Sequence, residues 1–270
     1  ALAAAKPSRE VGASEDDFEG GERVDSVGGT RTLSGGSSTG SFAAPFATID
    51  SSNGTVPTLG VALEPAGDSV QLSPEGYVTG LTATTSAGDT LVLSSTTGTP
   101  VDTGSSRDLA VRWGRWNNFT AFRNGSPVTT SQPFFYAYSD NLTPEAALGQ
   151  LEGSAQYSFR QGTSAHNRLA TVALKRLTFD VDFSASQITD ARLVIDNLTS
   201  GDTWVASQAS SSEPLSQKFV IPVKGQVVTG AINGEIDGAF VGINAEGAAV
   251  VYNVGNTDSG FVQGSGLMTR

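Results

Sequence analysis

The chain has 270 residues, a net charge of −11 and no cysteine, which excludes disulfides, thiolate catalysis and cysteine-bound metals. The acidic surplus offers no basic footprint for nucleic acid or for an anionic membrane surface. Charged residues make up 16% of the chain, below the roughly 25% of an ordinary soluble domain. Small polar residues take their place, as in extracellular β proteins. The composition predicts an exported protein, located outside the cell or on a bacterial outer surface, and nothing in it calls for a cofactor.

Residues 1–60 are expected to form a flexible, low-complexity segment. They contain paired glycines and the Gly/Ser-rich run 34–41, which bury too little apolar surface to offset the entropy of ordering. An acidic cluster in this segment includes Glu15, Asp16 and Asp17. The cluster lacks the spacing of a calcium-binding loop, so we interpret it as a solvated run and not as a metal site.

Aromatic residues are distributed unevenly along the chain. Residues 1–104 contain four of them, and residues 105–270 contain seventeen. Because a core needs bulky apolar area, the main core is expected in the second part. Residues 61–106 contain strand-like pieces such as 90–93, and are predicted to form short β-strands.

Alternating apolar and polar residues dominate the chain from residue 107 onward. Residues 177–183 alternate without interruption, which is the pattern of a half-buried strand. Turn signals such as Asn124-Gly125 separate successive strand candidates. Regularly spaced short strands with one apolar face predict an all-β fold, with an antiparallel barrel over residues 107–270. Only residues 143–149 have the pattern of a helical turn.

The same alternation occurs in outer-membrane barrels, whose strands run about 10 residues and turn apolar side chains toward lipid. The strands expected here are mostly shorter, and their outer face carries Asp, Lys and Arg. No apolar run approaches the ~18 residues of a membrane-spanning helix. The pattern therefore favours a water-exposed barrel, and the chain is not expected to span a membrane.

Two segments resemble a known family of bacterial surface proteins. Residues 112–116, Arg-Trp-Gly-Arg-Trp, resemble the W-G-x-W signature at the start of the C-terminal barrel of transferrin-binding-protein-B-like proteins. Residues 234–247 resemble the closing G-x-F-x-G-P-N-A turn of the same domain. This chain has Ile243 where the family usually has proline.

The resemblance covers residues 107–270 and leaves residues 1–100 unexplained. It implies a barrel of about eight antiparallel strands, filled by side chains and exported to the cell surface. Its motifs are structural, so it does not imply transferrin binding. By elementary packing, two tryptophans three residues apart suit a strand end, where one indole fills the barrel mouth and the other packs at its rim.

Convergent catalytic groups are missing from the sequence. His166 is the only histidine, and its setting between two alternating strands indicates an exposed loop residue and not a metal ligand or base. Asp180 and Asp182 lie on one face of one strand, so they are interpreted as solvated charges and not as paired acids. The chain is therefore predicted not to be an enzyme.

The arginines beside the tryptophans suggest a contact site. Arg112, Trp113, Arg115 and Trp116 are candidates for contact with an acidic partner, and stacking of the arginines on aromatic rings is the structural alternative. The main hypothesis is a structural subunit of a surface fibre or layer. In that hypothesis the chain self-associates, because the acidic residues 1–60 contact the arginines of a neighbouring copy. The alternative is a surface or secreted binding protein for a host protein, haem or a small ligand.

Overall fold

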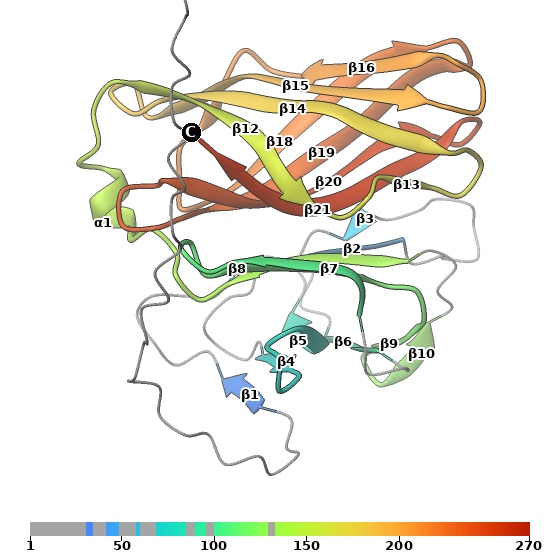
Figure 1. Cartoon of the computed structure of the whole chain (residues 1–270), viewed down its shortest axis with the longest axis horizontal. Helices are drawn as coiled ribbons and strands as arrows, with labels where there is room; N and C mark the ends of the chain where they lie inside the picture. Colours follow the sequence, from blue (N-terminus) through green and yellow to red (C-terminus); the bar gives the residue numbers. More distant parts are fainter. Residues whose placement is uncertain are drawn as a thin grey trace, which may run out of the picture.

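Figure 1 shows the computed structural model of the chain, which describes residues 31–34, 42–48, 58–59, 69–84, 90–95, 100–128 and 133–270. The regular elements of these residues are β-strands, apart from one short helix, α1 (Glu145–Leu148). The predicted all-β class is therefore confirmed. Most of the low-complexity segment 1–60, with Glu15, Asp16 and Asp17, lies outside the described residues.

Eight antiparallel strands close into a barrel, because β12 pairs with both β14 and β21. Two short strands attach to it: β13 (His166–Asn167) pairs with β21, and β17 (Glu213–Pro214) pairs with β15. The predicted barrel of about eight strands is confirmed. In order around the barrel the strands are β12 (Ser154–Gly162), β14 (Val172–Asp182), β15 (Gln187–Asn197), β16 (Thr203–Gln208), β18 (Lys218–Val227), β19 (Gly230–Val241), β20 (Gly247–Asn256) and β21 (Gly260–Thr269).

Apolar side chains fill the barrel interior. Leu177, Phe179 and Val181 of β14 are buried there, which confirms the alternation expected for this strand. The ring of Phe179 stacks on Tyr157, with 5.0 Å between ring centroids. Leu148 of α1 joins the same core. The helix α1 lies at one end of the barrel (Figure 1). The barrel is thus a packed core and not a pore.

The remaining strands form two sheets below the barrel in Figure 1. The six-stranded sheet has the order β1 (Arg31–Ser34), β4 (Ser69–Leu72), β5 (Val78–Thr84), β6 (Thr90–Ser95), β9 (Phe119–Arg123) and β10 (Ser126–Val128). The five-stranded sheet has the order β3 (Thr58–Leu59), β2 (Phe42–Thr48), β11 (Phe134–Ser139), β8 (Val111–Trp116) and β7 (Val101–Ser106).

These sheets correct the position at which the barrel begins. Residues 107–139 were predicted to belong to the barrel, whereas their strands, β8 to β11, lie in the two smaller sheets. The barrel strands begin at Ser154. The reason is that an alternating segment specifies a strand with one apolar face, and does not specify which sheet will cover that face.

The five-stranded sheet is the middle layer of three. Phe134 and Tyr136 of β11 face the six-stranded sheet, and Phe135 and Ala137 face the barrel. All six residues of β11 are buried for this reason. The barrel wall opposite consists of β19, β20 and β21, and Val251 of β20 is part of this second core. The chain therefore has three apolar cores in series: within the barrel, at the barrel wall and between the two smaller sheets.

The two tryptophans of the motif 112–116 hold these layers together from opposite faces of β8. Trp113 packs in the core at the barrel wall. Trp116 packs between the two smaller sheets, where its Nε1–H donates to the carbonyl of Val78 at 2.8 Å. A spacing of three puts the two side chains on opposite faces of a strand. The expectation that these indoles occupy the barrel mouth and rim is therefore wrong.

A buried carboxyl group lies at the barrel wall. Asp237 of β19 pairs with Val251 of β20, and its side chain points to the outer face of the barrel. Its Oδ2 has no hydrogen-bond partner. Burial raises the pKa of Asp237 well above its usual range, and the neighbouring carboxyl of Glu235 raises it further. Burial also raises the pKa of Glu235. Strand β2, which packs over this part of the wall, has no ionisable residue in its sequence.

We expect Asp237→Asn to increase stability at neutral and alkaline pH. Because the folded pKa is raised, stability falls as pH rises from the ordinary value of 3.8 through the folded pKa. The uncharged amide of the variant does not ionise, so the loss of stability at high pH does not occur. The substitution should therefore raise the free energy of unfolding by about 1–3 kcal/mol at pH 8. Urea unfolding at pH 5 and pH 8 measures the effect, with the exposed Asp108→Asn as the control. A less stable Asp237→Asn protein at pH 8 would contradict this account.

Gly114→Ala is expected to destabilise the protein. A Cβ at this position would overlap the Tyr136 hydroxyl and lie 2.7 Å from its Cζ, and the Tyr136 ring is fully buried. Overpacking of this kind costs about 1–3 kcal/mol. Thermal and urea unfolding measure it. The matched control is Gly149→Ala, where the nearest atom would be at 3.6 Å and stability should change by less than about 0.5 kcal/mol.

Candidate binding site at the mouth of the barrel

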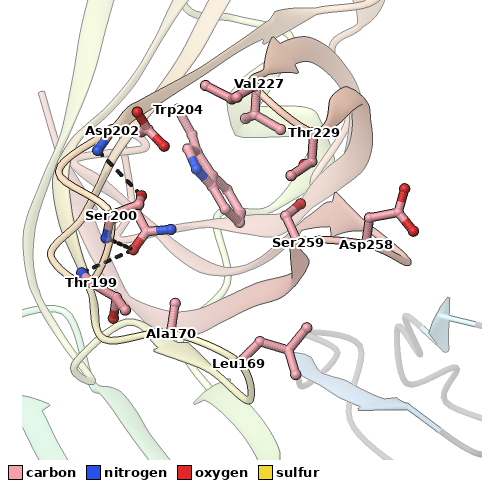
Figure 2. A pocket seen from close by; sticks show the side chains of 12 residues that line it. Leu169, Ala170, Thr199, Ser200, Asp202, Trp204, Val227, Thr229, Asp258 and Ser259 are labelled. Carbon is pink, nitrogen blue, oxygen red and sulfur yellow. Dashed lines mark hydrogen bonds between the residues drawn. The ribbon is translucent and has the colours of Figure 1, made fainter.

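Four loops meet at the end of the barrel opposite α1. They connect β13 to β14, β15 to β16, β18 to β19 and β20 to β21, and contain residues 168–171, 198–202, 228–229 and 257–259. Together they surround a pocket of about 240 Å³ (Figure 2). The mouth of the barrel is therefore a concave surface built from loops on a rigid scaffold, which is where binding groups usually lie.

Three of these loops begin with the same turn, made by an asparagine at the end of a strand. The Oδ1 atoms of Asn167, Asn197 and Asn256 each accept hydrogen bonds from the backbone N–H groups two and three residues later, at distances of 2.6–3.2 Å. Asparagine side chains close such turns by imitating a backbone carbonyl. Each loop therefore starts in a fixed conformation.

Further hydrogen bonds join the loops to one another. The Nδ2 of Asn167 donates to the carbonyl of Ser259 at 3.0 Å, which links the first loop to the last. The backbone N–H of Thr171 donates to Oγ1 of Thr199 at 2.9 Å, which links the first loop to the second. The mouth is thus pre-organised, so little conformational entropy remains to be lost when a partner binds.

The floor of the pocket is apolar. Trp204 of β16 is buried, belongs to the barrel core and points into the pocket in Figure 2. Ala170 and Val227 also line the pocket. The indole therefore seals this end of the barrel, and the pocket above it is a shallow depression and not a channel.

Exposed aliphatic side chains surround the pocket. Val228 is 84% exposed at the tip of the β18–β19 hairpin, and Leu169 and Leu198 are each 60% exposed on two of the other loops. A tight hairpin tip normally carries glycine, asparagine or aspartate. Three large exposed aliphatic residues therefore lie on the loops at this end of the barrel, and two of them, Leu169 and Val228, line the pocket. Exposed apolar surface at one end of a domain is a mark of interaction sites. We call Leu169, Leu198 and Val228 the apolar rim.

The charged residues that line the pocket are both acidic. Asp202 and Asp258 lie on opposite sides of Trp204 in Figure 2. Neither carboxylate accepts a hydrogen bond or forms an ion pair with any residue in the described ranges. Arg168 is the single basic residue of the four loops, and it does not line the pocket. The pocket therefore combines an apolar floor with a negative edge.

The structure disperses the contact residues that the sequence suggested. Trp113 and Trp116 are buried between the chain's own layers, so neither indole is available to a partner. The guanidinium carbon of Arg115 lies 6.0 Å from the centre of the Phe135 ring, which is the stacking named as the structural alternative. Arg112 lines a second hollow of about 200 Å³, together with Glu75 and Asp140. Contact of these residues with a neighbouring copy stays a prediction, and Glu15, Asp16 and Asp17 lie outside the described residues.

His166 and the strand aspartates form no catalytic group. His166 is not a plain loop residue: it lies in β13, is partly buried and sits 6.2 Å from the ring of Phe135. Burial lowers its pKa, and the charge of Arg115 lowers it further. Asp180 accepts from Nε2 of Gln156 and Asp182 accepts from a backbone N–H, so the two carboxylates have separate partners. Over the described ranges, no three His, Asp or Glu side chains gather as a metal site would require.

No protein-family model matches the chain, and no characterised protein matches its sequence. Isotype 1 transferrin binding protein B from serogroup B Neisseria meningitidis is structurally similar, with 12% identity and a TM-score of 0.43 over 85% of this chain and 43% of its own. Two mutants of transferrin binding protein B from Haemophilus parasuis Hp5 have 14% and 13% identity and TM-scores of 0.40, over 85% of this chain and 44% and 45% of theirs.

This chain spans less than half the length of those structures. Membership of their family is not shown for this chain. Shared architecture at this level transfers neither a ligand nor a binding residue. In the part of the chain that the structure describes, no helix is long and apolar enough to cross a membrane.

The mouth of the barrel was not found from the sequence, although one signal was present. Asn197 and Asn256 each follow an alternating strand candidate and precede a Thr/Ser/Gly/Asp-rich turn, which is where an asparagine turn is expected. An aliphatic residue at such a turn, such as Leu198, departs from ordinary turn composition. The convergence of the loops depends on barrel closure, which no local pattern contains.

We expect Asn197→Ala to loosen the mouth. The change removes the acceptor for the N–H groups of Thr199 and Ser200 and should lower the free energy of unfolding by about 1–2 kcal/mol. Hydrogen exchange at these two amides should accelerate more than exchange in the barrel strands. Asn197→Asp retains an acceptor oxygen and should keep the amides protected. Equal exchange in all three proteins would show that the turn does not depend on this side chain.

Proposed function

We propose that the protein is a non-enzymatic binding protein of the bacterial surface, and that it binds a protein partner at the mouth of the barrel. The apolar rim on pre-organised loops is the observation that supports this proposal most directly. Three aliphatic side chains exposed at 60–84% are costly to keep in water unless a partner covers them. Asparagine turns fix the loops that carry Leu169 and Leu198 before binding.

The size of the pocket favours a protein partner over haem or another small ligand. Pockets for drug-sized molecules measure about 300–1,000 Å³ and enclose most of the ligand. The pocket here measures about 240 Å³ and lies among exposed side chains. One side chain of a partner fits this space, and the apolar rim then contacts the surface around that side chain.

The main alternative, a subunit of a fibre or layer, receives no support from the described residues. Two of the four contact residues proposed for it around the motif 112–116, Trp113 and Trp116, are buried. The structurally similar proteins are named for binding transferrin. The partner proposed here is defined only by its chemistry: an extracellular protein with an apolar patch around one projecting side chain. The low charged fraction and the abundance of small polar residues support an exported location.

The double variant Leu169→Asp/Val228→Asp tests the proposal. Immobilised wild-type protein is exposed to serum, the retained protein is identified by mass spectrometry, and its purified form is titrated by calorimetry. Charges on the rim should weaken this binding at least tenfold, because they oppose apolar burial. The control is Ile243→Asp, which alters an aliphatic residue that is 71% exposed in the β19–β20 connection at the α1 end. Equal binding by all three proteins would place the interface elsewhere and refute the proposal.

A further inference from the structure

The pocket within the apolar rim has a chemical character of its own, distinct from that of the rim. Its floor is formed by Trp204 with Ala170 and Val227, and its charged lining residues are Asp202 and Asp258. If a wholly apolar side chain filled the pocket, the two carboxylates would have no positive charge or hydrogen-bond donor beside them at the edge of the interface. An anionic guest would meet repulsion from both.

The backbone holds both aspartates in place while their carboxylates stay unengaged. The carbonyl of Asp202 accepts from the N–H of Asn197 at 2.8 Å, and the N–H of Asp258 donates to Oδ1 of Asn256 at 3.1 Å. Two of the asparagine turns that shape the mouth therefore also position its acidic residues. Neither carboxylate has a partner within the described ranges, so both can accept hydrogen bonds from a ligand.

From this combination we propose that the pocket receives a basic side chain, lysine or arginine, that projects from the partner protein. The aliphatic stem covers the floor at Trp204, and the cationic end remains at the edge of the pocket that Asp202 lines, while Asp258 adds negative charge on the other side of the mouth. Long basic side chains divide in this way between apolar and polar surroundings. The inference rests on the proposed function, because it assigns chemistry to the same site.

The overall charge of the chain acts in the same direction. A net charge of −11 favours approach of a partner with a basic surface, and this attraction weakens with added salt. Arg168 contributes the single positive charge of the mouth loops, and two carboxylates outweigh it. Charge complementarity thus favours a cationic side chain of the partner, and the apolar floor favours a side chain with an aliphatic stem.

Short peptides provide a direct test with defined probes. Acetyl-Gly-Arg-Gly-amide is titrated into the isotopically labelled protein, and NMR shifts are followed at the Trp204 indole N–H and the amides of the four mouth loops. Trp204→Phe assigns the indole signal among the three tryptophans. The matched probes replace arginine with citrulline, which has the same shape without the charge, or with norleucine, which has the stem alone.

The arginine peptide should shift the mouth signals with a dissociation constant in the millimolar range, and citrulline and norleucine should bind at least fivefold more weakly. Asp202→Asn/Asp258→Asn should abolish this preference, and so should a rise in ionic strength to about 0.5 M. The control Asp190→Asn makes the same substitution at an exposed site on β15 and should leave the preference intact.

Equal binding of the arginine and citrulline peptides would overturn the assignment of a basic guest, while the rim variants would still decide whether the mouth binds a protein. Absence of any shift at the mouth with the arginine peptide would also overturn it. Failure of the proposed function is seen separately, as unchanged partner binding by Leu169→Asp/Val228→Asp.

Discussion

The packing of the five-stranded sheet on the outer wall of the barrel is the contact on which the rest of the architecture depends. It covers β19, β20 and β21 from outside, so these strands are buried on both faces although they belong to an antiparallel barrel. Ala239 and Ala249 lie at this contact, where small side chains let the two layers approach closely. The same burial leaves Asp237 without water, which explains its raised pKa.

The position of this contact also determines which surfaces remain for function. The five-stranded sheet occupies the side of the barrel and α1 lies at one end, so within the described residues no sheet or helix covers the loops at the other end. The apolar rim lies at that end, on turns that are closed by their own hydrogen bonds. The packed layers and the proposed recognition surface thus lie in different parts of the molecule, as in other loop-bearing β scaffolds.

Local patterns in the sequence were sufficient to predict the strands, but they were insufficient to predict which sheet each strand belongs to. The alternation of residues 177–183 gave β14 with the correct inward face. The motif 112–116 was correctly taken as a strand, but its tryptophans were assigned to the barrel because nothing in five residues distinguishes one sheet from another. The uninterrupted apolar run Phe-Phe-Tyr-Ala-Tyr of residues 134–138 was a sequence sign of a strand covered on both faces. The candidate site eluded prediction because Trp204, Leu169 and Val228 meet only after the barrel closes.

The asparagine turns divide the loops into a part that sets shape and a part that is free to vary. In each turn the asparagine side chain fixes the backbone. The side chains at the positions between the asparagine and its bonded amides take no part in these hydrogen bonds. Leu198 and Thr257 occupy such positions. Substitutions there change the surface presented by the mouth while the path of the loop is retained. The mouth therefore has the properties of a variable display surface, on which new specificities can be selected without rebuilding the barrel beneath.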